Sequence, residues 1–310
     1  MELPERAAET SHAFVLGLWR LADPKVSLAS FASMLLGASL AGSTVSISWP
    51  WLALTVFGIF ALEVAKNASG EIFDYDSGAD LGVADEDRSP FSGGKRVLVD
   101  ELLTRRQTTV IAAAGYILGA AAGFIIALWR EPQVLWIGLL GVACAYFYHA
   151  PPFKLSYRGW GELAVGVCYG PLICLGTYLV QTRDLRSEVI LVSLPLGLLI
   201  AAFLWVNEFP DEAADRAANK RTLVVRLGRP HAARVFAAMQ AIAFATVALL
   251  PLSGLPKTVW LGGIAVVPAA FAAGRLLRNP NTTREIIPAQ IATLAAFVLY
   301  SLGVSVGALL

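Results

Sequence analysis

The feature that most constrains this chain is a series of long runs that contain no charged residue. Seven of them cover residues 107–129, 132–153, 163–182, 189–207, 235–256, 258–274 and 286–310. A helix needs roughly 20 consecutive apolar residues to cross a bilayer, so each run is about long enough for one crossing. The runs lack the alternation of apolar and polar residues that marks a membrane barrel. They predict membrane-spanning helices.

A further charge-free run, 26–62, is too long for one helix. The small and hydroxyl residues at 42–44 suit a turn, and Pro50 suits the first turn of a following helix. Hydrophobic residues make up 56% of the 310 residues and charged residues 15%, whereas soluble domains carry roughly 25% charged residues. We therefore predict an all-α fold in one domain, 1–310: a polytopic membrane helix bundle with nine transmembrane helices.

The basic residues predict how this bundle lies in the membrane. With nine spans and a cytoplasmic N-terminus, 20 of the 24 Lys and Arg residues lie on the cytoplasmic side, and the other four are Arg130, Arg183, Arg186 and Lys257. This asymmetry follows the positive-inside rule. We expect a multi-pass protein of the cell membrane, with the charged segments 63–106 and 208–234 facing the cytoplasm.

The first 24 residues are expected to be a helix lying in the membrane interface, as Phe14 and Trp19 indicate. Glu2, Glu5 and Glu9 stand where a signal peptide carries basic residues, so no signal peptide is expected. The formal net charge of +1 gives no field that would attract nucleic acid. The three cysteines lie in apolar runs without a CxxC pair, which argues against a disulfide framework or a zinc site.

Two segments, 63–106 and 208–234, hold 26 of the 47 charged residues. Beside the second, Asn207, Asp211 and Asp215 are spaced i, i+4 and i+8, so a helix would place them along one face, with a kink at Pro210. Like charges at this spacing repel unless a cation lies between them. Carboxylate and amide oxygens are ligands that suit Mg²⁺.

The first segment repeats this order. Asn67, Glu71 and Asp74 are spaced i, i+4 and i+7, and Asp80 follows. Both segments then carry a basic pair in the same context, Lys95-Arg96-x-Leu98-Val99 and Lys220-Arg221-x-Leu223-Val224, and the two asparagines lie 140 residues apart. An internal duplication of a functional unit is the simplest explanation.

Two acidic clusters and two Lys-Arg pairs at one membrane face predict a metal–diphosphate site. Mg²⁺ held by carboxylates can bind a diphosphate, while Lys and Arg neutralise its remaining oxygens. The alternative is a pair of ordinary solvated loops, and the repeated order of the residues favours the site.

A third loop, 146–162, is rich in aromatic residues and has two readings. It is either an ordinary interface belt of Tyr and Trp, or part of the site, with Lys154 contacting phosphate and Tyr148 or Tyr157 beside a developing cation. His149 is not expected to bind zinc, because no His or Cys partner lies at ligand spacing.

From Lys25 onward these residues resemble the UbiA superfamily of intramembrane aromatic prenyltransferases, which are nine-helix bundles with Asp-rich motifs after the second and sixth helices. The second motif, Asn207-x-x-x-Asp211-x-x-x-Asp215 followed by Asn219-Lys220-Arg221-Thr222-Leu223, is similar to the family pattern. The residues most similar to 1,4-dihydroxy-2-naphthoate prenyltransferases of menaquinone synthesis are Asp80, Arg88, Pro90, the loop 148–162 and 220–223.

The first motif departs from the family pattern, which is Asn-Asp-x-x-Asp followed by Gly-x-Asp. Gly70 occupies the asparagine position in register with Asp74, and Gly78-Ala79-Asp80 fits the later part. Asn67 lies about one turn earlier, and we expect it to substitute for the missing asparagine.

The resemblance implies a Mg²⁺-dependent enzyme that transfers an isoprenyl group from a polyprenyl diphosphate, within the lipid bilayer, to an aromatic acceptor. The implied acceptor is 1,4-dihydroxy-2-naphthoate, whose carboxyl group leaves as CO₂; 4-hydroxybenzoate, homogentisate or a lipid alcohol are the alternatives. The implied metal ligands are Asn67, Glu71, Asp74, Asp80, Asn207, Asp211 and Asp215. The implied diphosphate-binding residues are Arg88, Lys95, Arg96, Lys154, Lys220 and Arg221, and the implied catalytic residues are Asp74, Asp211, Asp215 and Tyr148.

An ion-coupled transporter or a quinone-binding protein is the alternative from another class, because ionisable residues and internal repeats are common in transporters. Two features favour the enzyme. The acids cluster at one membrane face and not at the midplane, and four spans between the two units give parallel rather than inverted topology.

Overall fold

The three-dimensional structure is a computed structural model that describes residues 3–310, with side chains from His12 onward. In this part of the chain every regular element is a helix, and the one β-type pairing is a bridge between Ser89 and Ser92. The all-α prediction is confirmed. The expectation that there is no signal peptide falls on Glu2 and on the side chains of Glu5 and Glu9, which lie outside the described residues.

The described residues contain eight helices that are long and apolar enough to cross a membrane, and a ninth apolar helix, α5 (Val134–Phe147), with 14 residues. The eight are α2 (Pro24–Gly42), α3 (Trp49–Ser77), α4 (Arg105–Trp129), α6–α7 (Gly161–Thr182), α8 (Ser187–Ala217), α10 with η4 (Arg229–Ser253), η5–α11 (Lys257–Arg278) and α12 (Thr283–Leu309). They follow the predicted runs in order, and α2 ends at Gly42, where the sequence predicted a turn. The polytopic bundle is confirmed.

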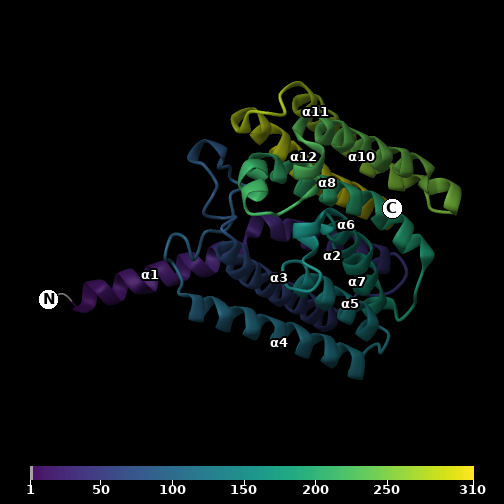
Figure 1. Cartoon of the computed structure of the whole chain (residues 1–310). Helices are drawn as coiled ribbons and strands as arrows, with labels where there is room; N and C mark the ends of the chain where they lie inside the picture. The colour runs from purple at the N-terminus through teal and green to yellow at the C-terminus, as the bar shows by residue number, and fades with distance from the viewer. Residues whose placement is uncertain (1–2) are drawn as a thin grey trace.

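The helices pack as neighbours of one bundle (Figure 1). Helices α10, α11 and α12 lie along one side, α3 and α4 lie along the opposite side, and α8 and α2 lie between these groups. Helix α8 is the most buried of the eight, with 72% of its most apolar window inside the protein. Helix α8 therefore lies in the interior of the bundle, between the group of α10, α11 and α12 and the group of α3 and α4.

Close packing against α8 depends on glycine. Helix α6 (Gly161–Val167) continues through the π-helical turn η3 (Cys168–Leu172) into α7 (Ile173–Thr182). A Cβ on Gly197 of α8 would lie 2.4 Å from the Gly166 carbonyl oxygen, and one on Gly170 would lie 2.7 Å from Gly197 Cα. Because no side chain fits between them, the two backbones are in direct contact, which holds Tyr169 at the bundle interior.

Helices α3 and α8 are the longest elements of the described chain, with 29 and 31 residues. At about 1.5 Å per residue they exceed the roughly 30 Å hydrocarbon core by several turns. They are the second and sixth spans, so they cross in the same direction and their C-terminal turns emerge at the same face. The charge at Glu63 suggested an earlier end for the second span, but the helix continues 14 residues further, to Ser77.

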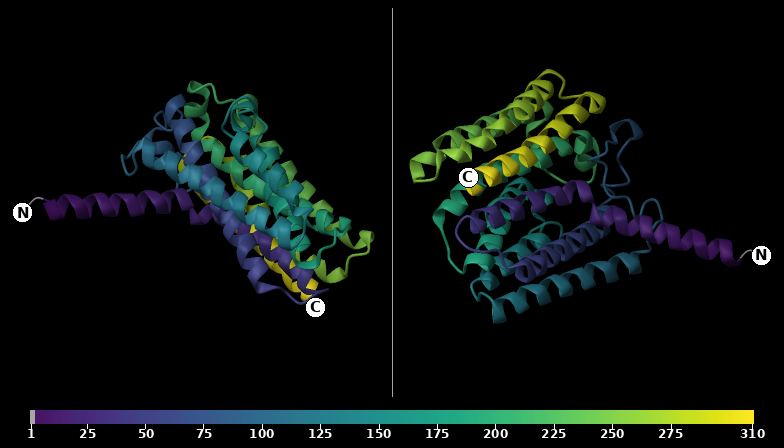
Figure 2. Two further views of the ribbon diagram at one scale, coloured as in Figure 1. Left: turned by 90° about the horizontal axis from the view of Figure 1, so that it is seen from below. Right: turned by 180° about the vertical axis from the view of Figure 1, so that it is seen from behind.

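Helix α1 (Leu3–Ala22) extends away from the bundle, as both views in Figure 2 show. Its C-terminal end packs against other elements, since Leu21 belongs to a small apolar cluster with Val97 and Leu103. The helix expected for this segment is confirmed. Its position in the membrane interface stays a prediction, and the largely exposed Val15 and Trp19 are consistent with it.

Candidate functional site

The ends of α3 and α8 enclose a polar cavity of about 720 Å³. The rest of its wall comes from the end of α1, the start of α2, the connection between α3 and α4, the segments after α5 and α8, and part of α6 and η3. Of the residues predicted from the sequence, those that line it are Asn67, Glu71, Asp74, Asp80, Arg88, Lys95, Arg96, Tyr148, Asn207, Asp211, Asp215 and Lys220. The two acidic clusters, 140 residues apart in the sequence, thus share one cavity.

On α3, the first acidic cluster holds the surrounding loops in place. Asn67 donates from its side chain to the Leu21 carbonyl oxygen at 2.7 Å, which ties α1 to the site. Glu71 Oε1 accepts from the Leu98 backbone N–H at 3.0 Å, and its other oxygen, Oε2, is buried without a hydrogen-bond partner among the described residues. Asn67 and Glu71 therefore each use one side-chain atom to bind the backbone of a neighbouring segment.

Asp74 is the acidic residue with the most polar neighbours. The Tyr157 hydroxyl donates to Asp74 Oδ1 at 2.6 Å, and His149 Nε2 lies 3.7 Å from Oδ2. Burial lowers the pKa of His149 to about 4, so this imidazole is neutral at physiological pH. Tyr157 is held in turn by the Arg221 backbone N–H, which donates to its carbonyl oxygen at 2.9 Å.

On α8, the second cluster carries oxygens without partners. Asn207 Oδ1 and Asp211 Oδ1 are buried, and neither has a hydrogen-bond partner in the described part of the protein. The helix continues through Pro210, so the i, i+4, i+8 face that the sequence predicted is present. Unpartnered buried oxygens are costly, so these atoms are suited to a cation supplied from outside the chain.

Lys220 joins the two acidic clusters. Its Nζ lies 3.6 Å from Asp74 Oδ2 on α3 and 3.4 Å from Asp215 Oδ1 on α8, and 5.6 Å from the centroid of the Tyr157 ring. Burial disfavours the charge on Lys220, but the carboxylates of Asp215 and Asp74 outweigh that effect, and its pKa lies well above the usual value. The residue is therefore a cation at any physiological pH.

The loop 78–104 folds over the cavity, and two of its residues with positive φ contact Asp80 there. Gly94 has φ +75°, and a Cβ there would lie 2.2 Å from Asp80 Oδ1, so only glycine fits against this carboxylate. Arg96 has φ +55° and donates to the Asp80 carbonyl oxygen at 3.1 Å. Burial, with the neighbouring Asp74 and Glu71, raises the pKa of Asp80 to about 8.

The three cations of this loop are paired with carboxylates. Their ion pairs are Arg88 with Asp85, Lys95 with Asp23, and Arg96 with Asp100. An anionic ligand in the cavity would therefore be bound by cations that are already positioned. Asp23 and Asp100 were not singled out from the sequence, because nothing in their local pattern distinguishes them from other loop acids.

Two predicted phosphate-binding residues lie elsewhere. Lys154 and Arg221 are not among the residues that line the cavity. The Lys154 ammonium lies 5.4 Å from the Tyr157 ring centroid, and the Arg221 side chain is exposed. Their assignment to a phosphate stays a prediction.

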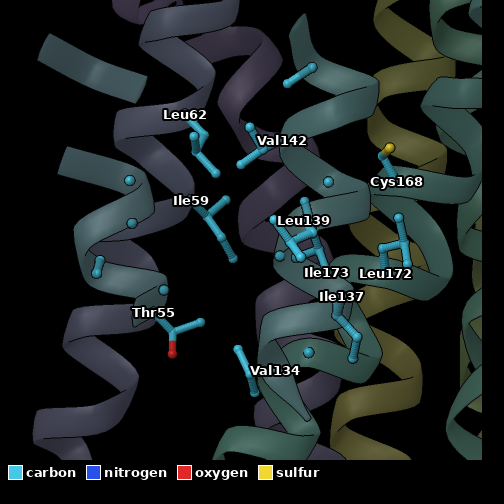
Figure 3. Close-up of a pocket in the computed structure, with 18 of the residues that line it drawn as sticks. Thr55, Ile59, Leu62, Val134, Ile137, Leu139, Val142, Cys168, Leu172 and Ile173 are labelled. Carbon is cyan, nitrogen blue, oxygen red and sulfur yellow. The ribbon is translucent and has the colours of Figure 1, made fainter. Parts of the chain in front are cut away.

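A second, apolar cavity of about 260 Å³ lies deeper in the bundle, between α3, α4, α5 and the span formed by α6, η3 and α7. Figure 3 shows Ile59 and Leu62 of α3 and Val134 and Ile137 of α5 pointing into it. Four residues line both cavities: Lys66, Tyr148, Val165 and Tyr169. The polar and apolar cavities are therefore neighbours that share a wall. Lys66 and Tyr169 were not identified from the sequence as site residues. Lys66 was placed in a loop because charges were used to mark the ends of the spans, and Tyr169 lies inside an uncharged run.

The polar cavity contains side-chain oxygens that could bind a divalent cation. Within the described residues, no group of three or more His, Cys, Asp or Glu side chains is arranged to hold a metal ion. The donor chemistry nevertheless fits, because the unpartnered buried oxygens of Glu71, Asn207 and Asp211 belong to one cavity and are hard ligands of the kind Mg²⁺ prefers. A cation that arrives with a diphosphate needs fewer protein ligands than one held by the protein alone.

Comparison with known proteins gives a consistent answer. The UbiA prenyltransferase family matches residues 30–297. The chain is 30% identical over 286 residues to a 1,4-dihydroxy-2-naphthoate octaprenyltransferase of Mycobacterium tuberculosis, covering 92% of this chain and 94% of that protein. It is 26% identical over 294 residues to the Bacillus subtilis protein of the same name, covering 94% and 92%.

Solved structures with a similar fold include a UbiA homologue from Aeropyrum pernix, with a TM-score of 0.70 at 20% identity, covering 90% of this chain and 97% of that one. A UbiA homologue from Archaeoglobus fulgidus, bound to GPP and Mg²⁺, has a TM-score of 0.65 at 16% identity, covering 94% and 99%. At 20% and 16% sequence identity, the similarity to these structures establishes the fold alone.

Proposed function

The chain belongs to the UbiA prenyltransferase family, and we propose that it transfers an isoprenyl group from a polyprenyl diphosphate to 1,4-dihydroxy-2-naphthoate in a Mg²⁺-dependent step of menaquinone biosynthesis. The names of the relatives from M. tuberculosis and B. subtilis support this acceptor. The GPP and Mg²⁺ bound to the A. fulgidus homologue support the donor and the metal.

The observation that carries the proposal is the cavity shared by α3 and α8. Asp74 and Asp215 belong to different helices, and both lie within 4 Å of the Lys220 ammonium. A diphosphate is a dense anion that needs both cations and a metal ion to be held in an otherwise acidic cavity. This cavity offers Lys220, Lys95, Arg96 and Arg88 on its wall.

The proposed metal ligands lie on two sides of the cavity. They are Asn67, Glu71, Asp74 and Asp80 on one side, and Asn207, Asp211 and Asp215 on the other. Mg²⁺ bound with the diphosphate would neutralise the leaving group and so lower the barrier to breaking the allylic C–O bond. Lys220 holds Asp74 and Asp215 in position before a ligand arrives. Tyr157 orients Asp74 through its hydroxyl.

The apolar cavity is the proposed site of the isoprenyl tail. Its lining is mostly apolar, with Glu63 and Lys66 as the charged residues, and it adjoins the polar cavity at Tyr148 and Tyr169. A tail in this position would place the reacting carbon between the two cavities, away from water. The faces of Tyr148 and Tyr169 can stabilise positive charge that develops there.

The net reaction is balanced with this acceptor. The bond between the allylic carbon and the diphosphate oxygen breaks, and diphosphate leaves with the electron pair. A bond forms between the allylic carbon and the aromatic ring, and the carboxylate of the ring leaves as CO₂, with its bonding electrons retained by the ring. Another acceptor of the family, such as 4-hydroxybenzoate, homogentisate or a lipid alcohol, is the alternative.

The basic residues support an active site that faces the cytoplasm, in a multi-pass protein of the cell membrane. Both charged segments carry the cations of the cavity, and 20 of 24 basic residues lie on this side in the proposed orientation. Cytoplasmic orientation lets the diphosphate group of the donor and the charged acceptor enter the polar cavity from the cytoplasm.

The proposal is tested with purified protein in lipid, Mg²⁺, geranylgeranyl diphosphate and dihydroxynaphthoate, followed by mass analysis. We expect a prenylated product that has lost the mass of CO₂. Prenylation of 4-hydroxybenzoate or homogentisate instead would refute the acceptor but retain the prenyl transfer. The same product in excess EDTA would refute the metal requirement.

A further inference from the structure

Lys66 is the one charged residue among the four that line both cavities. It lies on α3 eight residues before Asp74, which places it roughly 12 Å deeper in the bundle along the helix axis. Unlike the proposed metal ligands of α3, which line the polar cavity alone, Lys66 also lines the apolar cavity. Its depth is that at which the reacting carbon of the donor would lie.

The ammonium of Lys66 has aromatic neighbours and makes no direct ion pair with any described residue. Nζ lies 3.4 Å from the Tyr169 hydroxyl and 5.8 Å from the ring centroids of both Tyr148 and Tyr169. No carboxylate lies within 4.0 Å of it in the described part of the chain. The acid one turn earlier, Glu63, instead accepts a hydrogen bond from the Ser30 hydroxyl.

An ammonium inside a membrane bundle is costly unless an anion or other polar group compensates it. Two ring faces compensate Lys66 in part, since cation–π contacts contribute about 0.5–2 kcal/mol. Glu63 also lines the apolar cavity, but it makes no direct ion pair with Lys66. The arrangement is that of a cationic site whose anion comes from a ligand.

The ligand that must reach this point is the acceptor. In the proposed reaction the aromatic ring attacks the allylic carbon, so the two reacting atoms must come within about 3–3.5 Å of each other. The proposed function places the tail in the apolar cavity and the diphosphate between the acidic clusters of the polar one. The allylic carbon that joins them then lies where the two cavities meet, and an acceptor against Lys66, Tyr148 and Tyr169 would lie beside it.

We propose that Lys66 binds the carboxylate of the aromatic acceptor, with the acceptor ring against Tyr148 and Tyr169. The inference rests on the proposed prenyl transfer and extends it to substrate class: the acceptor is a carboxylated phenol or hydroquinone, not a neutral one. Lys66 therefore acts as a specificity residue that selects the acceptor by its negative charge.

The test is a binding measurement with two acceptor analogues, 1-hydroxy-2-naphthoate and 1-naphthol, which differ only in the carboxylate. The protein is held in lipid with Mg²⁺ and geranylgeranyl thiolodiphosphate, an unreactive donor, and dissociation constants are measured by calorimetry. We expect the native protein to bind the naphthoate at least tenfold more tightly than the naphthol. Lys66→Met should remove most of this preference, because a hydrogen bond to a charged group contributes about 1.5–3 kcal/mol, or roughly 10–150-fold.

Three comparisons keep the test decisive. Lys66→Arg retains the charge and should retain the preference within a few-fold. Lys257→Met, the same substitution at an exposed residue outside both cavities, should leave it unchanged. Unchanged affinity for the thiolodiphosphate in Lys66→Met shows that the variant is folded. If Lys66→Met does not fold, the same binding measurements are made with Lys66→Gln.

The outcomes separate this inference from the proposed function. An unaltered preference in Lys66→Met overturns the inference. Weaker binding of the thiolodiphosphate, with the preference intact, assigns Lys66 to the donor and also overturns it. If native protein makes no prenylated product from dihydroxynaphthoate, the proposed function fails independently of either binding result.

Discussion

Replacing Lys220 with methionine removes the cation that joins the two acidic clusters. Its Nζ lies 3.6 Å from Asp74 and 3.4 Å from Asp215, and its side chain is 17% exposed. At an effective dielectric constant of about 20, each contact represents roughly 5 kcal/mol of Coulomb attraction, partly offset by desolvation. Removing one partner of a buried ion pair costs about 3–5 kcal/mol, because the remaining charges are left uncompensated.

The assay is thermal unfolding in detergent without Mg²⁺, together with prenyl transfer. A loss of this size should lower Tm by about 4–8 °C for a chain of 310 residues. Activity should fall by about 10²–10³-fold. The pKa of Lys220 is raised in the folded protein. Its contribution is therefore fully present at neutral pH and is lost only as pH rises past the ordinary lysine range.

Lys154→Met is the matched control. Lys154 also lies over the Tyr157 ring, at 5.4 Å from its centroid, but it does not line the cavity. Its loss should cost no more than about 1 kcal/mol. Equal Tm values for Lys220→Met and the native protein, or an equal fall in both variants, would refute the account of Lys220.

Three further predictions follow from the same geometry. Asp211→Asn removes a carboxylate whose Oδ1 is unpartnered, so Mg²⁺-dependent turnover should fall at least 100-fold, and full activity would contradict the ligand assignment. Tyr157→Phe keeps the ring beside Lys220 but loses the hydroxyl at 2.6 Å from Asp74; urea unfolding should show a loss of about 1 kcal/mol, and a kinetic assay a several-fold lower kcat. Gly138→Phe adds a ring to the apolar cavity at a glycine with open space around it, so turnover should shift toward shorter isoprenyl donors, whereas Gly263→Phe, equally open but outside that cavity, should not change the preference.

The sequence predicts the bundle well because apolar length is a local property. The runs between charges gave the spans, and the residues at 42–44 gave the turn between α2 and α3. The spacing of Asn207, Asp211 and Asp215 predicted a shared face, since the helical period is fixed. These inferences need no knowledge of tertiary contacts.

The parts of the site that the sequence could not predict depend on where side chains point. The repeated Lys-Arg pair suggested equal roles for Lys220 and Arg221. In the structure Lys220 lies between two carboxylates, while the Arg221 backbone binds Tyr157 and its side chain is exposed. Adjacent residues in an irregular segment point in different directions, and only tertiary contacts decide which one enters the cavity.

Lys66 is a site residue that the sequence analysis did not identify. Its charge made it part of a predicted loop, because charges normally end a membrane span. The helix continues past it to Ser77, and Tyr148 and Tyr169 provide the aromatic surroundings that make a buried lysine tolerable. A charge inside an apolar segment is itself a signal of function, and it could have been read that way.

The central claim is that the Asp-rich ends of α3 and α8 together bind a metal–diphosphate. The most direct test is a crystal structure with geranylgeranyl thiolodiphosphate and Mn²⁺, which is located by its anomalous scattering. The account predicts Mn²⁺ between Asp211 on α8 and the acidic residues of α3, the diphosphate beside Lys220, and the tail in the cavity of Figure 3. Mn²⁺ bound at one helix alone, or a diphosphate outside this cavity, would contradict it.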